Sequence, residues 1–166
     1  MKNIVRLLVL SLLFALPAAA QSWDWSMPGS AGIIDPAAIT VWDLTATTFR
    51  IRTNSVGSVT ARYPVTNTYG SSFDISPAWG TLEATISDSS ATAASVTATL
   101  YQVDKCSDQE TALCTITSND GDGTPTCQTC TFSGGLDFAN NAYYVLVTAT
   151  KTDVPPVAEL HSLAIY

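Results

Sequence analysis

The chain has 166 residues, of which 46% are hydrophobic and 13% are charged. Its 14 acidic and 7 basic residues give a net charge of −7 at neutral pH. Nucleic acids and anionic lipids are themselves negative, so a surface this acidic is a poor partner for either. The charge therefore excludes nucleic-acid binding and leaves glycans or other surface proteins as partners to consider.

Residues 1–20 have the three parts of a cleavable secretory signal peptide. Lys2 and Arg6 supply a positive start, an apolar run follows, and small residues end the segment. We expect cleavage after Ala20, because the apolar run is well short of the roughly 20 residues that a membrane-spanning helix needs. The mature part, 21–166, is then exported to the periplasm, the cell surface or the medium, and membrane anchoring after cleavage is not expected.

The mature part has the length of one domain and a composition typical of β-sheets. Thr, Ser and Ala fill most small and polar positions, and β-branched side chains fit a pleated surface better than a helix. No stretch has a convincing helical period. Turn signals separate roughly eight short strands, the pattern of an antiparallel β-sandwich or jelly roll. The sequence predicts a single all-β domain of this class.

Six strands stand out in chain order by alternating apolar and polar residues: 47–54, 58–65, 81–88, 94–103, 141–151 and 159–166. We expect the first two to pair across the turn NSVG, and the next two to pair across the turn SSATAA. The fifth is apolar on both faces near its centre, which predicts a central strand covered on both sides. The predicted core residues are Phe49, Ile51, Val59, Ala61, Tyr63, Leu82, Ala84, Ile86, Val96, Ala98, Leu100, Leu163 and Ile165.

The four cysteines are Cys106, Cys114, Cys127 and Cys130, all within 25 residues. Zinc is disfavoured, because only the last two form the close pair that a tetrahedral thiolate site uses twice. A thiol–disulfide oxidoreductase is disfavoured too, because no helix follows the CQTC motif. An even number of cysteines in an exported chain favours structural disulfides.

Residues 104–132 then form an insertion, a hairpin held together by disulfides around the turn SNDGDG. We expect Cys114 to pair with Cys127 and Cys106 with Cys130, because folding the two strands together brings the first pair close. The alternatives, 106–114 with 127–130 or 106–127 with 114–130, stay open at this stage.

The same turn resembles the first half of a calcium loop. Ser118, Asp120 and Asp122 occupy alternate positions before a glycine. The first ligand position holds serine rather than aspartate, and Thr129 stands where an EF-hand carries its bidentate glutamate. These three residues are therefore a weak calcium candidate, and the turn requirement for Asn, Asp and Gly explains them better. We expect no bound cofactor.

No catalytic constellation stands out. His161 is the only histidine, and its phase with Leu163 in the last strand favours a partly buried structural role. No nucleophile motif of the G-x-S-x-G kind is present. Glu83 and Glu159 are carboxylates of the type that a glycosidase uses, but nothing in the sequence pairs them. We therefore expect a protein that is not an enzyme.

Three tryptophans fall in segments predicted to be loops: Trp23, Trp25 and Trp79. Exposed rings of this kind stack on the faces of sugars, so a carbohydrate-binding module is one hypothesis. The favoured interpretation is that these rings fill the ends of the sandwich, since large aromatic side chains are usually mostly buried.

The sequence thus predicts an exported structural or interaction domain of unknown partner, with the carbohydrate-binding module as its alternative. A small outer-membrane β-barrel is a further alternative, because the chain ends on an aromatic strand. Several strands, however, are shorter than the roughly 9–11 residues of a tilted membrane strand, and aromatic girdles are absent.

Overall fold

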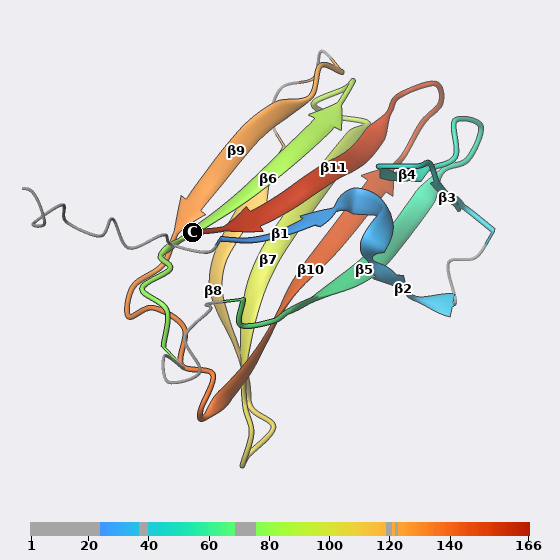
Figure 1. Cartoon of the computed structure of the whole chain (residues 1–166). Coiled ribbons are helices and arrows are strands. Elements are labelled where there is room, and N and C mark those ends of the chain that lie inside the picture. Colours follow the sequence, from blue (N-terminus) through green and yellow to red (C-terminus); the bar gives the residue numbers. More distant parts are fainter. Residues whose placement is uncertain (1–23, 37–39, 69–75, 119–120, 122) are drawn as a thin grey trace, which may run out of the picture.

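The structure is a computed structural model that describes residues 24–36, 40–68, 76–118, 121 and 123–166. Two antiparallel sheets face each other across one hydrophobic core (Figure 1). The predicted all-β sandwich is therefore confirmed. The predicted signal peptide, Trp23, Asp120 and Asp122 lie outside the described residues. None of the helical segments that are described is long and apolar enough to cross a bilayer.

Sheet A has the strand order β3-β4-β11-β6-β9, and β1 pairs with β11 beside this path. Its strands are β1 (Trp25–Pro28), β3 (Trp42–Leu44), β4 (Phe49–Ile51), β6 (Thr81–Asp88), β9 (Thr126–Thr131) and β11 (Ala158–Ile165). Because β4 pairs with the start of β11 and β1 with its end, both strands share one edge of β11. Strand β9 forms the opposite edge of the sheet.

Sheet B has the strand order β2-β5-β10-β7-β8. Its strands are β2 (Ile33–Ile34), β5 (Gly57–Val65), β7 (Ala94–Asp104), β8 (Glu110–Thr117) and β10 (Asn141–Lys151). Strand β10 pairs along its length with both β5 and β7, so its predicted central place is confirmed. Its outward side chains are half-buried or exposed, which differs from the predicted cover on both faces.

The core is formed by alternate residues of the long strands in both sheets. Every predicted core residue is buried, and the alternation of apolar and short polar side chains explains why. Trp25 and Trp79 are buried as well, and several further core residues were not predicted: Val65, Ile116, Leu136, Tyr143, Val145, Val147, Ala149, Ala158 and Leu160.

The strand pairing differs from the prediction at two turns. Strands 81–88 and 94–104 do not pair, because the first lies in sheet A and the second in sheet B. The same holds for β4 and β5 around the turn NSVG. Each of these turns carries the chain across the core from one sheet to the other. An alternating pattern fixes the inward face of a strand but not whether the next strand lies beside it or opposite it.

A bulge in β11 changes which residues of the last strand face the core. Between Leu160 and Ser162 the register with β6 shifts by one residue. Leu160 and Leu163 are therefore both buried, although they stand three residues apart. The extra residue is His161. Because of the bulge, its side chain does not lie on the same face of the strand as Leu163, and it is partly exposed.

Two buried ionisable side chains, Asp88 and Lys151, lie at the ends of strands β6 and β10. Asp88 at the end of β6 is fully buried, and its Oδ1 accepts a hydrogen bond from the backbone of Gly121 at 2.9 Å. Lys151 at the end of β10 is also buried, and its Nζ donates to the carbonyl oxygens of Arg52 and Thr53. Burial lowers the pKa of Lys151.

Candidate functional site

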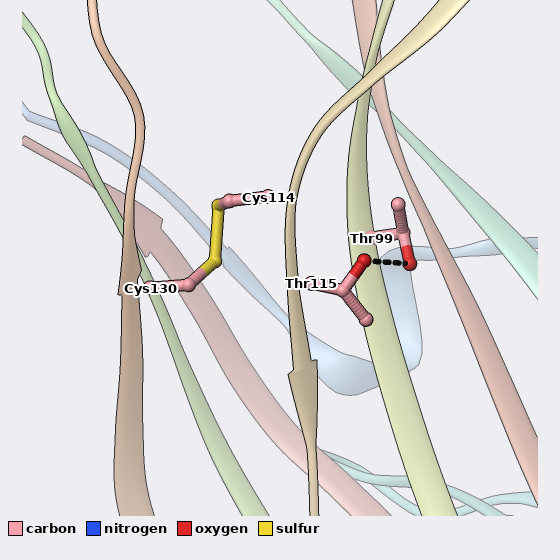
Figure 2. The surroundings of a disulfide bond; sticks show 4 residues. All are labelled: Thr99, Cys114, Thr115 and Cys130. Carbon is pink, nitrogen blue, oxygen red and sulfur yellow. Dashed lines mark hydrogen bonds between the residues drawn. A yellow bond between two sulfur atoms is a disulfide. The ribbon is translucent and has the colours of Figure 1, made fainter.

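A disulfide joins Cys114 on β8 to Cys130 on β9 (Figure 2). Strand β8 is the edge of sheet B and β9 is the edge of sheet A, so the bond ties the two sheets together along one side. The predicted hairpin is therefore wrong: these strands pair with β7 and β6, and both belong to the sandwich itself.

The predicted pairing of Cys114 with Cys127 and of Cys106 with Cys130 is wrong for the same reason. Cys130 stands opposite the core residue Leu82 and faces the other sheet, whereas Cys127 lies on the outward face of β9. Cys106 lies in the turn after β7. Both unpaired thiols are exposed, and the Sγ of Cys127 lies 3.4 Å from the hydroxyl of Thr85. The observed bond is one of the two in the alternative pairing 106–127 with 114–130.

The calcium candidate is only partly described. The Ser118 hydroxyl is buried and accepts a hydrogen bond from the backbone of Val96 at 2.8 Å, so it extends the sheet edge. Within the described ranges, no group of three or more His, Cys, Asp or Glu side chains is placed to hold a metal ion. The calcium role of Asp120 and Asp122 stays a prediction, because both residues lie outside the described part of the chain.

The predicted ligand-binding role of Trp25 and Trp79 is wrong. Each side chain is only 2% exposed, so neither ring can stack on a sugar. Trp25 lies in strand β1, opposite Ile165, rather than in a loop. Trp79 packs edge-on against Phe138, with ring centroids 6.2 Å apart. Both rings fill the sandwich, as the favoured interpretation predicted.

A charged row crosses the outer face of sheet A. Asp43, Arg50 and Glu159 stand directly opposite one another on β3, β4 and β11, and Ser87 on β6 continues the row. The Arg50 guanidinium lies 3.1 Å from the Asp43 carboxylate and 3.2 Å from the Glu159 carboxylate. Hydrogen bonds to these two carboxylates raise the pKa of Arg50.

His161 lies beside this row without forming a catalytic triad. Its Nε2 is 3.1 Å from the Ser87 hydroxyl and 3.7 Å from the Glu159 carboxylate. In a triad the base uses one ring nitrogen for the serine and the other for the carboxylate, whereas here one nitrogen contacts both. Ser87 is also only 1% exposed, so its hydroxyl cannot reach a substrate.

The outer face of sheet B has a different character. Tyr144 on β10 and Tyr101 on β7 stand directly opposite each other and stack, with ring centroids 5.2 Å apart and planes 14° apart. Arg62 lies on the neighbouring strand β5, and its guanidinium is 6.0 Å from the centre of the Tyr144 ring. Burial and a hydrogen bond to Glu110 raise the pKa of Tyr144. These side chains form an aromatic ridge across three strands.

Hydroxyl side chains form cross-strand rows on the rest of this face, beside the apolar Leu146 and Pro64. One row consists of four threonines directly opposite one another on β5, β10, β7 and β8: Thr60, Thr148, Thr97 and Thr117. The next row is Ser58, Thr150 and Ser95. Thr99 and Thr115 pair on the other side of the first row. We call these nine residues the hydroxyl field; the seven in the first two rows include no charged side chain.

The aromatic ridge and the hydroxyl field were both missed from the sequence. Each strand showed its own part in the sequence, since serine or threonine occupies every outward position of 95–99 and 148–150. Only the register, however, aligns these positions into rows and brings Tyr101 beside Tyr144.

No protein-family model matches the chain, and no curated protein matches it. Among solved structures, the K1 adhesin domain of Lys-gingipain from Porphyromonas gingivalis is 14% identical, with a TM-score of 0.45, covering 87% of this chain and 98% of that one. A xylan-binding module, CBM15, is 16% identical with a TM-score of 0.42, covering 88% of this chain and 91% of that one.

The CBM32 domain of AlyQ, solved with 4,5-unsaturated mannuronic acid, is 11% identical with a TM-score of 0.37. The match covers 86% of this chain and 93% of the CBM32 chain. At these identities and scores we infer no ligand or activity from the likenesses. The chain is a two-sheet β-sandwich, and its likeness to these domains is limited to the fold.

Proposed function

We propose that the protein is an exported, non-catalytic binding domain whose contact surface is the outer face of sheet B. One observation carries the proposal: this face combines an accessible aromatic ridge with rows of hydroxyl groups in an otherwise acidic protein. Among the outward positions of the described strands of sheet B, only Arg62 and Glu110 are charged. The ligand that suits such a face is itself uncharged.

A neutral glycan has the matching chemistry. Its hydroxyl groups donate and accept hydrogen bonds, as threonine and serine do, and the C–H faces of its rings pack on aromatic side chains. Tyr101 stands opposite Ala112 on β8, whose side chain is too small to cover the ring on that side. This place beside Tyr101 is where we expect one sugar ring to bind.

The experiment compares two tyrosine variants on an array of soluble neutral glycans, with the hits measured by calorimetry. Tyr101→Ala removes the ring beside which we expect the sugar to bind, and we expect it to weaken binding by about tenfold, as loss of an aromatic anchor typically does. Tyr166→Ala is the matched control, because Tyr166 is exposed and contacts Glu83 on the outer face of sheet A. Circular dichroism checks that both variants are folded.

The proposal fails if the folded wild-type domain binds no neutral glycan, or if both variants lose affinity equally. Retained binding in Tyr101→Ala would also exclude the aromatic ridge as the contact.

Covalent assembly into a surface structure is the second candidate, favoured by the two exposed thiols Cys106 and Cys127. In an oxidising compartment such thiols join subunits when no partner exists within the chain. Native mass spectrometry without reductant tests this second candidate. Oligomers that dissociate with reductant support assembly, and a monomer excludes it.

A further inference from the structure

The hydroxyl field is a two-dimensional lattice whose spacing the sheet determines. Neighbouring strands place its members about 4.8 Å apart across the sheet. Alternate residues of one strand place them about 6.7 Å apart along it. The row of Thr60, Thr148, Thr97 and Thr117 runs without interruption over four strands, and the row of Ser58, Thr150 and Ser95 lies beside it.

The lattice is stiff as well as regular. Threonine is β-branched, so its hydroxyl has few rotamers to lose on binding. Hydrogen bonds within the field restrict it further: Ser58 to Thr150 at 3.2 Å, and Thr99 to Thr115 at 3.0 Å (Figure 2). Figure 2 also shows that Thr115 points away from Cys114, so the disulfide holds the edge strand from its inner side. Little side-chain entropy is therefore lost when this surface binds a ligand.

The absence of charge from the first two rows restricts the partner further. One outward row of sheet A consists of Asp43, Arg50 and Glu159. The first two rows of the hydroxyl field on sheet B consist of threonine and serine alone. Charged side chains would serve solubility equally well on both faces, so the difference points to a neutral partner. A partner that matches a repeating array of weak contacts must itself repeat at fixed spacings.

We infer that the hydroxyl field binds the ordered face of a crystalline neutral polysaccharide, in addition to any single chain bound at the aromatic ridge. The inference rests on the proposed function, because it names the physical form of the glycan. Fluid membranes lack fixed lateral spacing and folded proteins lack a lattice, so neither offers many equivalent contacts at once. Each hydroxyl contact is weak, and retention comes from their number.

The experiment measures partition of the mature protein between solution and microcrystalline cellulose or crystalline chitin. Thr148→Lys places a charge at the centre of the field, and Thr117→Lys does so on the exposed edge strand, where misfolding is less of a risk. Thr129→Lys is the matched control, since Thr129 is an exposed threonine on the outer face of sheet A. We expect both field variants to lower the partition constant by about tenfold and the control to leave it unchanged.

The inference is overturned by equal loss in the control, by no loss in either folded field variant, or by equal retention on amorphous cellulose. Retention on ice but on neither polysaccharide would also overturn it, because the lattice would then match frozen water. If soluble neutral glycans bind and crystalline ones do not, the inference falls and the proposed function stands. If neither binds, both fall.

Discussion

Tyr63 shows how one buried side chain fixes the N-terminal part of the fold. It lies fully buried on β5, and its hydroxyl donates a 2.5 Å hydrogen bond to the carbonyl oxygen of Gly29 in the short 3-10 helix η2 (Gly29–Ala31). A Cβ on Gly29 would lie 2.1 Å from the carbonyl oxygen of Leu160, and one on Gly32 would overlap the Tyr63 ring. Only glycine lets the chain approach this closely.

Replacing Tyr63 with Phe keeps the ring and leaves the Gly29 carbonyl without its buried donor. We expect the free energy of unfolding to fall by about 1–2 kcal/mol, the usual cost of an unsatisfied buried group. Urea unfolding followed by circular dichroism at neutral pH measures this difference. An unchanged midpoint would mean that water replaces the hydroxyl.

The variant Tyr63→Phe should also change how the stability of the protein depends on alkaline pH. Burial raises the pKa of Tyr63 above its ordinary value of 10.0. A group with a raised pKa in the folded state contributes stability fully below the unfolded pKa, and loses it as pH rises through the folded pKa. The stability of the wild type should therefore decline above about pH 10, and Tyr63→Phe should decline less. Urea midpoints at pH 8 and 11 for both proteins test this, and parallel declines would contradict it.

The disulfide arrangement is a property of the two edge strands β8 and β9. Cys114 and Cys130 face each other between the sheets, and Cys106 and Cys127 face solvent. The native protein, alkylated without reductant, should gain two labels, on Cys106 and Cys127 only. Reduction under denaturing conditions should raise the count to four. Peptide mapping checks the positions, and no label before reduction would show a second disulfide.

Removing the inter-sheet bond should destabilise the sandwich. The half-cystines are 16 residues apart, and a loop of about 15 residues corresponds to roughly 3 kcal/mol in the chain-entropy account. We expect a loss of about this size for the double variant Cys114→Ala, Cys130→Ala in urea unfolding. The control is Cys106→Ser with Cys127→Ser, which should keep the wild-type midpoint; an equal loss in this control would contradict the assignment.

At the scale of elements, the sequence predicted the long strands and their inward faces but not their neighbours. The alternation of Leu82, Ala84 and Ile86 determines which face of β6 is buried. It cannot distinguish a hairpin from a crossing to the other sheet, because both place the same residues inside. The bulge at His161 was also not predicted, although the apolar residues change phase between Leu160 and Leu163.

The whole molecule has one charged outer face and one that is nearly neutral. Binding through the neutral face should depend little on ionic strength, because salt weakens only contacts between charges. We expect affinity for a neutral glycan to change by less than about twofold between low salt and about 1 M, where the Debye length is about 3 Å. Calorimetry at both concentrations tests this, and a steep loss of affinity would indicate binding through the Arg50 row instead.

Whole-molecule packing also limited the prediction of the site. Trp79 stands among turn residues, and no local pattern says whether its ring points to solvent or to Phe138. Tyr101 and Tyr144 are 43 positions apart in sequence, so their stacking depends on the register of β7 against β10. Local periodicity identifies candidate faces, whereas a surface made of several strands exists only after they are aligned.

The bond between Cys114 and Cys130 has a mechanical consequence for a protein that is pulled at its ends. The 16-residue separation between the two cysteines is removed from the extensible contour length, which hides roughly 50–60 Å of chain. Under tensile load the hydrogen bonds of β8 and β9 can break, yet the segment between the cysteines cannot extend. Force therefore passes through a covalent link from one sheet to the other, and the domain would yield a shorter tether than its sequence length implies.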